Sequence, residues 1–537
     1  MTLRLTSSAL ALAAMTAPAL ADVTPEQVMQ SWIDYYQTMG YSVTEGGRSK
    51  DGSTLTLTDV VFAGGTPEGR MTMSVPSIAL TDQGDGTVRT VFSDQMQLIV
   101  SGTEPESGPY EVPATIAMPG NSIVTSGAPE DMTHQFDYPT IRIETERMTS
   151  DGVETPLPIT VGIADSKGRF HAAQGAPRKY DYDMTTGAID YKAQMTGENG
   201  DQFSLSGKLD ALETRGTLSG AGSAADLESQ MAAALEAGLA MDGMLKGGPI
   251  SGEFAFAGTE EGQPTSGSGK YQGRGFDVGF SLSRDGLGYQ VASDGVSVDV
   301  VSPQMPMPVR YGFDSTSFDM QLPVSKADAP QPFKLAYTLA GLTIGDELWA
   351  MFDPQSKLPR TPASLDIDLT GLMTVTENLF DAAKATAEPP PADDTDGATA
   401  EGVSPDAPAD DAEAQAEAET GPEADAPSPF EPVELSINQI ALDLLGAKLN
   451  ASGALKAPAG GSMETAPVGT IHAEYQGVNT LVDSLGEMGL IPQDQLGMVR
   501  MMLAMFAKPV AGEPDRMTTE LEFREGGAVF ANGQQIK

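Results

Sequence analysis

Three histidines are the residues of this chain best suited to acid–base or metal chemistry near neutral pH. His134, His171 and His472 are far apart in the sequence, and none has a second histidine nearby. A zinc site of three histidines would need all of them to converge, which the sequence gives no reason to expect. The segment Thr133-His134-Gln135 is polar, so we expect His134 at the surface of a loop.

The familiar catalytic motifs are absent from the sequence, which has no H-E-x-x-H, no G-x-S-x-G, no Walker loop and no Rossmann glycine pattern. It has no cysteine, which excludes thiol catalysis, iron–sulfur clusters and cysteine-bound zinc. A carboxylate pair for glycoside hydrolysis stays open, because the distance between two side chains cannot be read from a sequence. We therefore predict a protein that is not an enzyme, with no catalytic, cofactor-binding or metal-binding residues.

Two acidic, glycine-containing segments resemble fragments of calcium-binding loops. Asp394-Thr395-Asp396-Gly397 lacks the full ligand spacing, the closing glutamate and the flanking helices of such a loop. Gly273-Arg274-Gly275-Phe276-Asp277 is similar to part of a calcium-binding repeat, but it occurs once. Neither segment predicts a specific metal site, and we expect no cofactor.

The chain is strongly acidic, with 75 Asp and Glu against 31 Lys and Arg and a formal charge of −44. Such a chain repels nucleic-acid phosphates and anionic lipid headgroups, so we expect no nucleic-acid partner. Aromatic residues make up only 6% of the sequence, whereas methionines number 27. Methionine fills irregular gaps in a core, and the alternative is a pliable lining that faces a ligand.

The first 21 residues have the pattern of a secretory signal peptide. A short cationic start, 1–4, precedes an apolar, alanine-rich stretch, 5–20, and Ala19-Leu20-Ala21 is a typical cleavage site. The mature chain would begin at Asp22 and contains no other apolar run long enough to cross a membrane. We therefore predict an exported, periplasmic protein without a transmembrane segment.

Most of the remaining chain alternates apolar and polar residues, which is typical of strands with one buried face. In segment 333–375 two alternating runs flank a short helix, 347–352, and we expect this unit at the centre of a large antiparallel sheet. The apolar faces must meet, either in a two-layer sandwich or in one sheet curved around its own apolar side. The predicted fold class is mainly β (α+β), a large curved antiparallel β-sheet or roll with a few packed helices.

Local signals predict particular turns and helices. Two alternating runs, 180–186 and 189–195, flank Gly187, which predicts a hairpin, and Pro76 reverses the alternation of its strand, which predicts a bulge or an edge. Segment 24–40 begins with a capping box and should be a helix. Its Trp32 and Tyr35 should pack on the sheet, or alternatively form a binding face. Further helices are expected at 224–246, 479–487 and 492–507.

Segment 385–432 differs from the rest in composition. It is rich in Pro, Ala, Asp and Glu, has no Lys or Arg, and cannot bury enough apolar surface to order itself, so we predict a disordered linker. Because strands flank it, we interpret it as a loop inserted into one fold. After the signal peptide, 1–21, the chain would then comprise a β-rich body, 22–384, and C-terminal strands with a helix pair, 433–537, that complete the same fold.

Two groups of residues carry a resemblance to a family. They are GDELWAMFDP at 345–354 followed by LPR at 358–360, and GLIP at 489–492 followed by a methionine-rich helix and ANGQ at 531–534. The chain resembles the uncharacterised bacterial proteins grouped as domain of unknown function 2125, over most of its mature length. The resemblance implies no known activity. The strand pattern is more distantly similar to envelope proteins of the AsmA type, which implies a role with lipids.

These observations favour an envelope protein that is not an enzyme and that holds a lipid or another apolar ligand in a β-groove. The reasons are the strands with one apolar face, the abundant methionine and the predicted export. The alternative is a structural or partner-binding envelope protein with a fully packed core. A hydrolase with unrecognised carboxylates is the third hypothesis.

Overall fold

The computed structural model describes residues 22–537, except 67–68, 105–107, 176, 198–199, 221–230, 261, 306 and 381–427. Strands make up 64% of the structure and helices 11%, and the strands pair in large antiparallel arrays, which confirms the predicted fold class. The predicted signal peptide lies outside the described residues, as does all of the predicted linker except its last five residues. No helix in the described part of the chain is long and apolar enough to cross a membrane.

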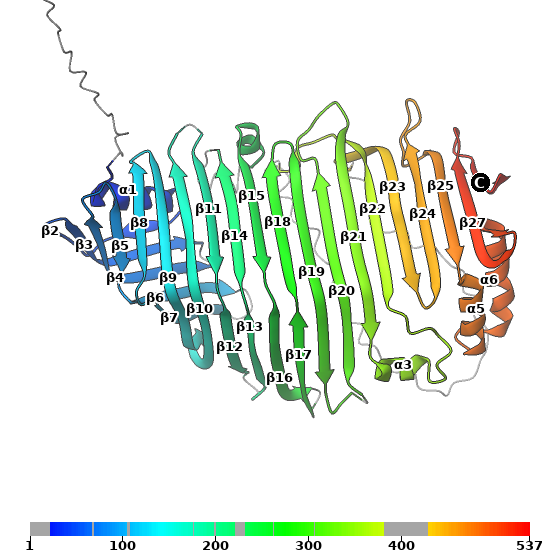
Figure 1. Ribbon diagram of the computed structural model, residues 1–537, viewed down its shortest axis with the longest axis horizontal. Helices are drawn as coiled ribbons and strands as arrows, with labels where there is room; N and C mark the ends of the chain where they lie inside the picture. The colour runs from blue at the N-terminus through cyan, green and yellow to red at the C-terminus, as the bar shows by residue number, and fades with distance from the viewer. Residues whose placement is uncertain are drawn as a thin grey trace, which may run out of the picture. The chain divides into compact units, whose positions relative to one another are not determined.

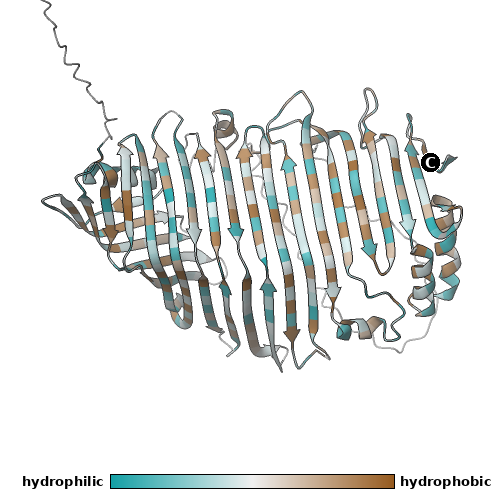
Figure 2. Ribbon diagram, in the orientation of Figure 1, coloured by the Kyte–Doolittle hydropathy of each residue, from teal (hydrophilic) through white to brown (hydrophobic). Residues whose placement is uncertain are grey.

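The chain divides into two compact units. The N-terminal unit contains the described residues of Met1–Ala224, Gly243–Gly275 and Val300–Pro306, and the C-terminal unit contains those of Ala225–Asp242, Phe276–Asp299 and Met307–Lys537. In both units, apolar and polar residues alternate along the strands (Figure 2).

The N-terminal unit consists of one helix followed by antiparallel strands (Figure 1). The elements are α1 Pro25–Thr38, β1 Ser42–Thr44, β2 Gly47–Asp51, β3 Thr54–Gly65, β4 Arg70–Asp82, β5 Val88–Phe92, β6 Gln95–Glu104, β7 Gly108–Ala117, β8 Ser122–Ala128, β9 Asp131–Ser150, β10 Val153–Ala173, β11 Lys179–Thr186, β12 Ile189–Thr196, β13 Gln202–Leu209, β14 Leu212–Ser219, β16 Ile250–Glu260 and β17 Gln263–Gly273.

Long strands of this unit each pair with two shorter strands laid end to end. β9 pairs with β8 over its first half and with β7 over its second, and β10 pairs in the same way with β11 and β12. β4 likewise pairs with β5 and β6. The sheet therefore consists of two halves that meet along a line, which we call the crease. Figure 1 shows β6 and β7 running across the direction of β8.

The backbone of the long strands is irregular where the crease crosses them. Asp59 of β3 stands opposite Pro76 of β4, and Asp165 of β10 stands opposite Pro139 of β9, and neither pair joins its ladder. Both aspartates have left-handed φ values, 52° and 49°. A proline has no N–H to donate, so an unpaired position suits it. The predicted reversal of alternation at Pro76 is confirmed, because Val75 and Ile78 on either side of it are both buried.

The hairpin predicted around Gly187 is wrong. Among the described strands, β11 and β12 do not pair with each other; both run along β10. The Gly187 and Ala188 backbone instead joins Ala164 of β10, through Gly187 N–H to Ala164 O and Ala164 N–H to Ala188 O, each at 2.9 Å. A side chain at Gly187 would press against Ala164 O. Gly187 therefore lies at the crease, where the backbone bonds to β10, and not in a hairpin turn.

The helix predicted for 224–246 is wrong over its second half. Residues 221–230 lie outside the described part, and helix is present only at 231–236. Gly238 has a φ of +98°, a conformation that favours glycine and ends helices. β15 follows as Ala240–Gly247. Leu235 and Leu239, which suggested one continuous helical stripe, are both buried, although they lie on either side of this glycine.

The C-terminal unit is also antiparallel, with the order β20–β21–β22–β23–β24–β25–β27. β21 and β22 are interior, as predicted for segment 333–375. β22 pairs directly with β23 on the far side of the acidic segment, and β23 begins at Phe430. Its elements are β18 Gly275–Ser283, β19 Gly286–Val301, β20 Val309–Leu322, β21 Gln331–Ile344, α3 Asp346–Phe352, β22 Ala363–Val375, β23 Phe430–Leu444, β24 Ala447–Lys456, β25 Val468–Gln476, α5 Val478–Glu487, α6 Gln493–Phe506, β26 Lys508–Val510, β27 Glu513–Phe523, β28 Val529–Ala531 and β29 Gln534–Gln535.

Candidate functional site

Helix α1 begins as the sequence predicts. Thr24 is the N-cap, and its side chain and that of Gln27 form the reciprocal bonds of a capping box, which fixes the first turn. Val28 and Met29 are fully buried in the main hydrophobic cluster, together with residues of β3, β4, β5, β6 and β9. Trp32, one turn further on, packs against the same cluster. The helix therefore lies with its apolar face toward the sheet, as expected.

A cavity of about 490 Å³ lies between α1 and the two halves of the creased sheet. Its volume is within the range of small-molecule sites, roughly 300–1,000 Å³. Nine of its 21 lining residues are Phe, Tyr or Trp, although such residues form only 6% of the chain. The lining residues are Ser31, Trp32, Tyr35, Tyr36, Phe62, Met73, Phe92, Met96, Ile116, Met118, Ile123, His134, Phe136, Tyr138, Ile141, Ile143, Ile163, Phe170, Ala172, Gln174 and Tyr180.

Aromatic contacts attach α1 to the sheet around this cavity. The Trp32 ring stacks on Phe92 of β5 with centroids 5.8 Å apart. The Tyr35 ring meets Phe170 of β10 and Tyr180 of β11 edge-on, at 5.2 Å and 5.4 Å. The predicted packing of Trp32 and Tyr35 on the sheet is confirmed, and both side chains also line the cavity; a binding face stays a prediction.

His134 is not at the surface of a loop, and that prediction is wrong. It lies on β9, is 4% exposed and lines the cavity. Its Nδ1 lies 2.8 Å from the Thr125 hydroxyl and 3.4 Å from the indole nitrogen of Trp32. An indole N–H can only donate, so we assign Nδ1 as an acceptor and place the ring proton on Nε2. Burial lowers the pKa of His134 to about 4, with a smaller contribution from the charge of His171, so the ring is neutral at pH 7.

A signal for His134 was present in the sequence. Met132, His134, Phe136 and Tyr138 occupy every second position, which is the pattern of a strand with one buried face. The polar neighbours Thr133 and Gln135 belong to the other face. Tyr138 shares the buried environment, which raises its pKa to about 12.

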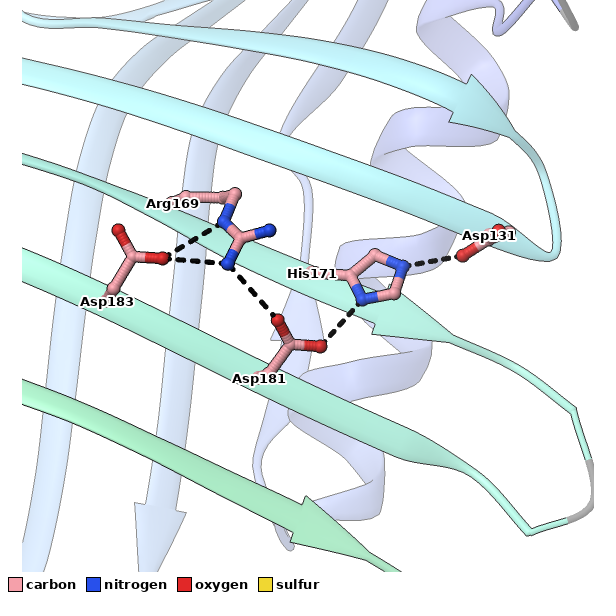
Figure 3. A network of polar contacts seen from close by, with 5 residues as sticks. All are labelled: Asp131, Arg169, His171, Asp181 and Asp183. Carbon is pink, nitrogen blue, oxygen red and sulfur yellow. Dashed lines mark hydrogen bonds and ion pairs between the residues drawn. The ribbon is translucent and has the colours of Figure 1, made fainter.

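The outer face of the same strands carries a polar network (Figure 3). His171 of β10 contacts Asp131 through Nε2 at 2.6 Å and Asp181 through Nδ1 at 2.7 Å. Both ring nitrogens therefore donate to carboxylates, and the bonds to Asp181 and then Asp131 raise the pKa of His171. Arg169 extends the network to Asp183 by a bond of 3.0 Å.

This network and the cavity lie on opposite faces of β10. Phe170 and Ala172 line the cavity, whereas Arg169 and His171, at the alternate positions, point to the other face. The network thus fastens β9, β10 and β11 to one another behind the cavity. In the described part of the chain, no group of three or more His, Asp or Glu side chains forms a potential metal site.

The C-terminal unit has two surface features of its own. The first is an open polar groove of about 680 Å³, lined by Asn438, Gln439, Asn450, Ala451, Ser452, His472, Ala473, Glu474, Lys508, Thr518, Thr519, Glu520, Asn532 and Gly533. The second is helix α6, in which none of the residues, all of them described, is buried. Its Met498, Met501, Met502 and Met505 are each more than half exposed. We call this row of four residues the methionine stripe.

The N-terminal unit thus defines a mainly β protein with a cavity of ligand size lined by neutral side chains. The chain belongs to a family described as uncharacterised proteins conserved in bacteria (DUF2125), whose sequence profile matches residues 248–532. The match covers the second half of the chain, and the cavity residues precede it. No curated protein and no solved structure matches the chain.

Proposed function

We propose that this protein holds an apolar ligand, such as a lipid, in the cavity beneath α1, and that it does so without catalysis after export to the periplasm. The observation that carries the proposal is the lining. It combines nine aromatic residues with aliphatic side chains and, among the described residues, contains no Asp, Glu, Lys or Arg. Apolar pockets with a few polar groups are typical of small-molecule sites.

The energetics are adequate for reversible binding. Each methylene group that leaves water contributes about 0.8 kcal/mol, and association costs roughly 4–15 kcal/mol. A ligand must therefore bury most of a long chain or several rings to bind, which a cavity of about 490 Å³ permits. The aromatic walls also fix the shape of the site, because their side chains have few rotatable bonds.

The test is the binding of N-phenyl-1-naphthylamine, an uncharged apolar fluorophore, to the purified protein, together with native mass spectrometry for co-purified lipid. We expect saturable binding at one site. Ala172→Phe fills the cavity and should remove most of this binding. Val153→Phe on the same strand, at an exposed position outside the cavity, is the matched control and should not. Absence of both co-purified lipid and saturable binding would overturn the proposal.

A second candidate function, binding of a protein partner, is favoured by the methionine stripe. Contiguous exposed apolar side chains commonly mark interaction sites, and methionine is frequent on surfaces that adapt to several partners. Leu490 and Phe506, near the two ends of α6, are exposed as well. The hydrolase hypothesis finds no support in the cavity, because no carboxylate lines it among the described residues.

A further inference from the structure

His134 offers one unused hydrogen-bond donor to the cavity. Trp32 and Thr125 both contact its Nδ1, which leaves the proton on Nε2. Within the described part of the chain, Nε2 has no hydrogen-bond partner. Nε2 is not one of the fully buried unpaired atoms of the described residues, so its surface remains accessible, and an unpaired donor in an apolar site is unfavourable. An acceptor atom on a ligand would therefore find a donor already positioned by the indole and the hydroxyl.

The charges around the cavity favour a neutral acceptor over an anionic one. No Lys or Arg is among the described lining residues. Arg178 donates to the Thr38 hydroxyl at the end of α1. The His171 ring is on the opposite face of β10, held between Asp131 and Asp181. The remaining polar lining groups, Ser31, Gln174 and the tyrosines, are uncharged. A carboxylate placed here would lose its hydration without gaining a counterion, which is costly, and the net charge of −44 adds to the repulsion.

We infer that the ligand class is a neutral lipid or similar apolar molecule that carries an ester or ketone oxygen, and that the Nε2–H of His134 donates to this oxygen. The inference rests on the proposed function and refines it. His134 is then the residue that selects among apolar ligands, and the aromatic walls supply affinity without this selection.

Three fluorescent probes of matched shape test it: methyl 1-pyrenebutyrate, 1-butylpyrene and 1-pyrenebutyrate. The ester should bind about fivefold tighter than the hydrocarbon, the gain of one neutral hydrogen bond. The carboxylate should bind more weakly than the ester by at least about tenfold. His134→Leu should abolish the preference for the ester over butylpyrene, whereas His134→Gln, which keeps a neutral donor, should retain part of this preference.

The possible outcomes are distinct. If all three probes bind and the ester has no advantage, or if the carboxylate binds best, the inference is wrong although the cavity still binds apolar ligands. If none of the three binds, the proposed function itself fails, and the inference with it. The relative affinities of the unaltered protein for the three probes test the inference even if neither variant folds.

Discussion

Helices α1 and α6 are both 14 residues long, and both place apolar side chains three or four positions apart. Their surroundings nevertheless differ. α1 buries Val28 and Met29 completely and covers a cavity with Trp32 and Tyr35, whereas α6 buries none of its described residues and presents the methionine stripe to solvent. Spacing alone therefore does not determine what a helix face contacts.

The side-chain types explain part of this difference. Around α1 the contacts are between rings, which have few rotamers and hold a cavity open at a fixed shape. Methionine has three rotatable side-chain bonds and adapts to irregular surfaces. The first arrangement suits a small ligand, and the second suits a larger surface that need not have one shape. The comparison thus supports the two proposals, ligand binding in the N-terminal unit and partner binding at α6.

The same substitution in the two helices gives the largest expected contrast. Met29→Ala removes a fully buried side chain and should lower the free energy of unfolding of the N-terminal unit by about 2–5 kcal/mol. Met501→Ala, at a position 68% exposed, should change the stability of its unit by no more than about 0.5 kcal/mol. Urea unfolding measures both.

The two tryptophans allow each unit to be followed separately. Trp32 lies in the N-terminal unit and Trp349 in the C-terminal unit, and the chain has no other. Trp349→Phe leaves fluorescence from the first unit only, and Trp32→Phe from the second only. Comparable losses for Met29→Ala and Met501→Ala would contradict the comparison, because α6 would then be packed as tightly as α1.

The enclosure of His134 beneath α1 predicts a dependence on pH. Its folded pKa, about 4, is below the unfolded value of about 6.5. Between these values the unfolded chain binds a proton that the folded ring does not, so the stability of the N-terminal unit should fall as pH falls through this window. The full effect is about 3 kcal/mol at pH 4.

His134→Gln isolates this contribution. Carboxylates also titrate in acid, and the carboxylates and His171 are present in both proteins, so the difference between the two pH profiles belongs to His134. We expect the Trp349→Phe protein to lose more stability between pH 6.5 and pH 4 than the same protein with His134→Gln, as measured by urea unfolding. Parallel profiles would show that His134 is open to solvent and that α1 does not close the cavity.

The sequence was sufficient for features that depend on neighbouring residues. The capping box of α1, the pair α5 and α6, and the strand–helix–strand unit around α3 all follow from local patterns, and all are present. The position of His134 also followed from alternation, but the polar residues on either side of it obscured the pattern. Local chemistry thus predicts which element forms and which face is apolar.

The crease depends on residues that are distant in sequence. Asp59 and Asp165 are unremarkable until the strand register places each opposite a proline. The runs on either side of Gly187 have ideal hairpin spacing, yet both pair with β10, because the long strand offers an edge to each. The cavity exists only because the sheet halves meet at this line, so its lining could not be assembled from sequence separations.

The last prediction concerns chemical reactivity and needs no change in stability. Hydrogen peroxide converts exposed methionine to its sulfoxide, whereas a buried side chain reacts only when the structure opens. Met498, Met501, Met502 and Met505 should therefore oxidise early, and Met29 should stay reduced under native conditions. Peptide mass spectrometry over a time course gives the rate at each residue. Slow oxidation of the methionine stripe would mean that α6 is covered in solution, for instance by a second copy of the chain. If the oxidation rates then rise on dilution of the protein, the covering molecule is a second copy of the chain.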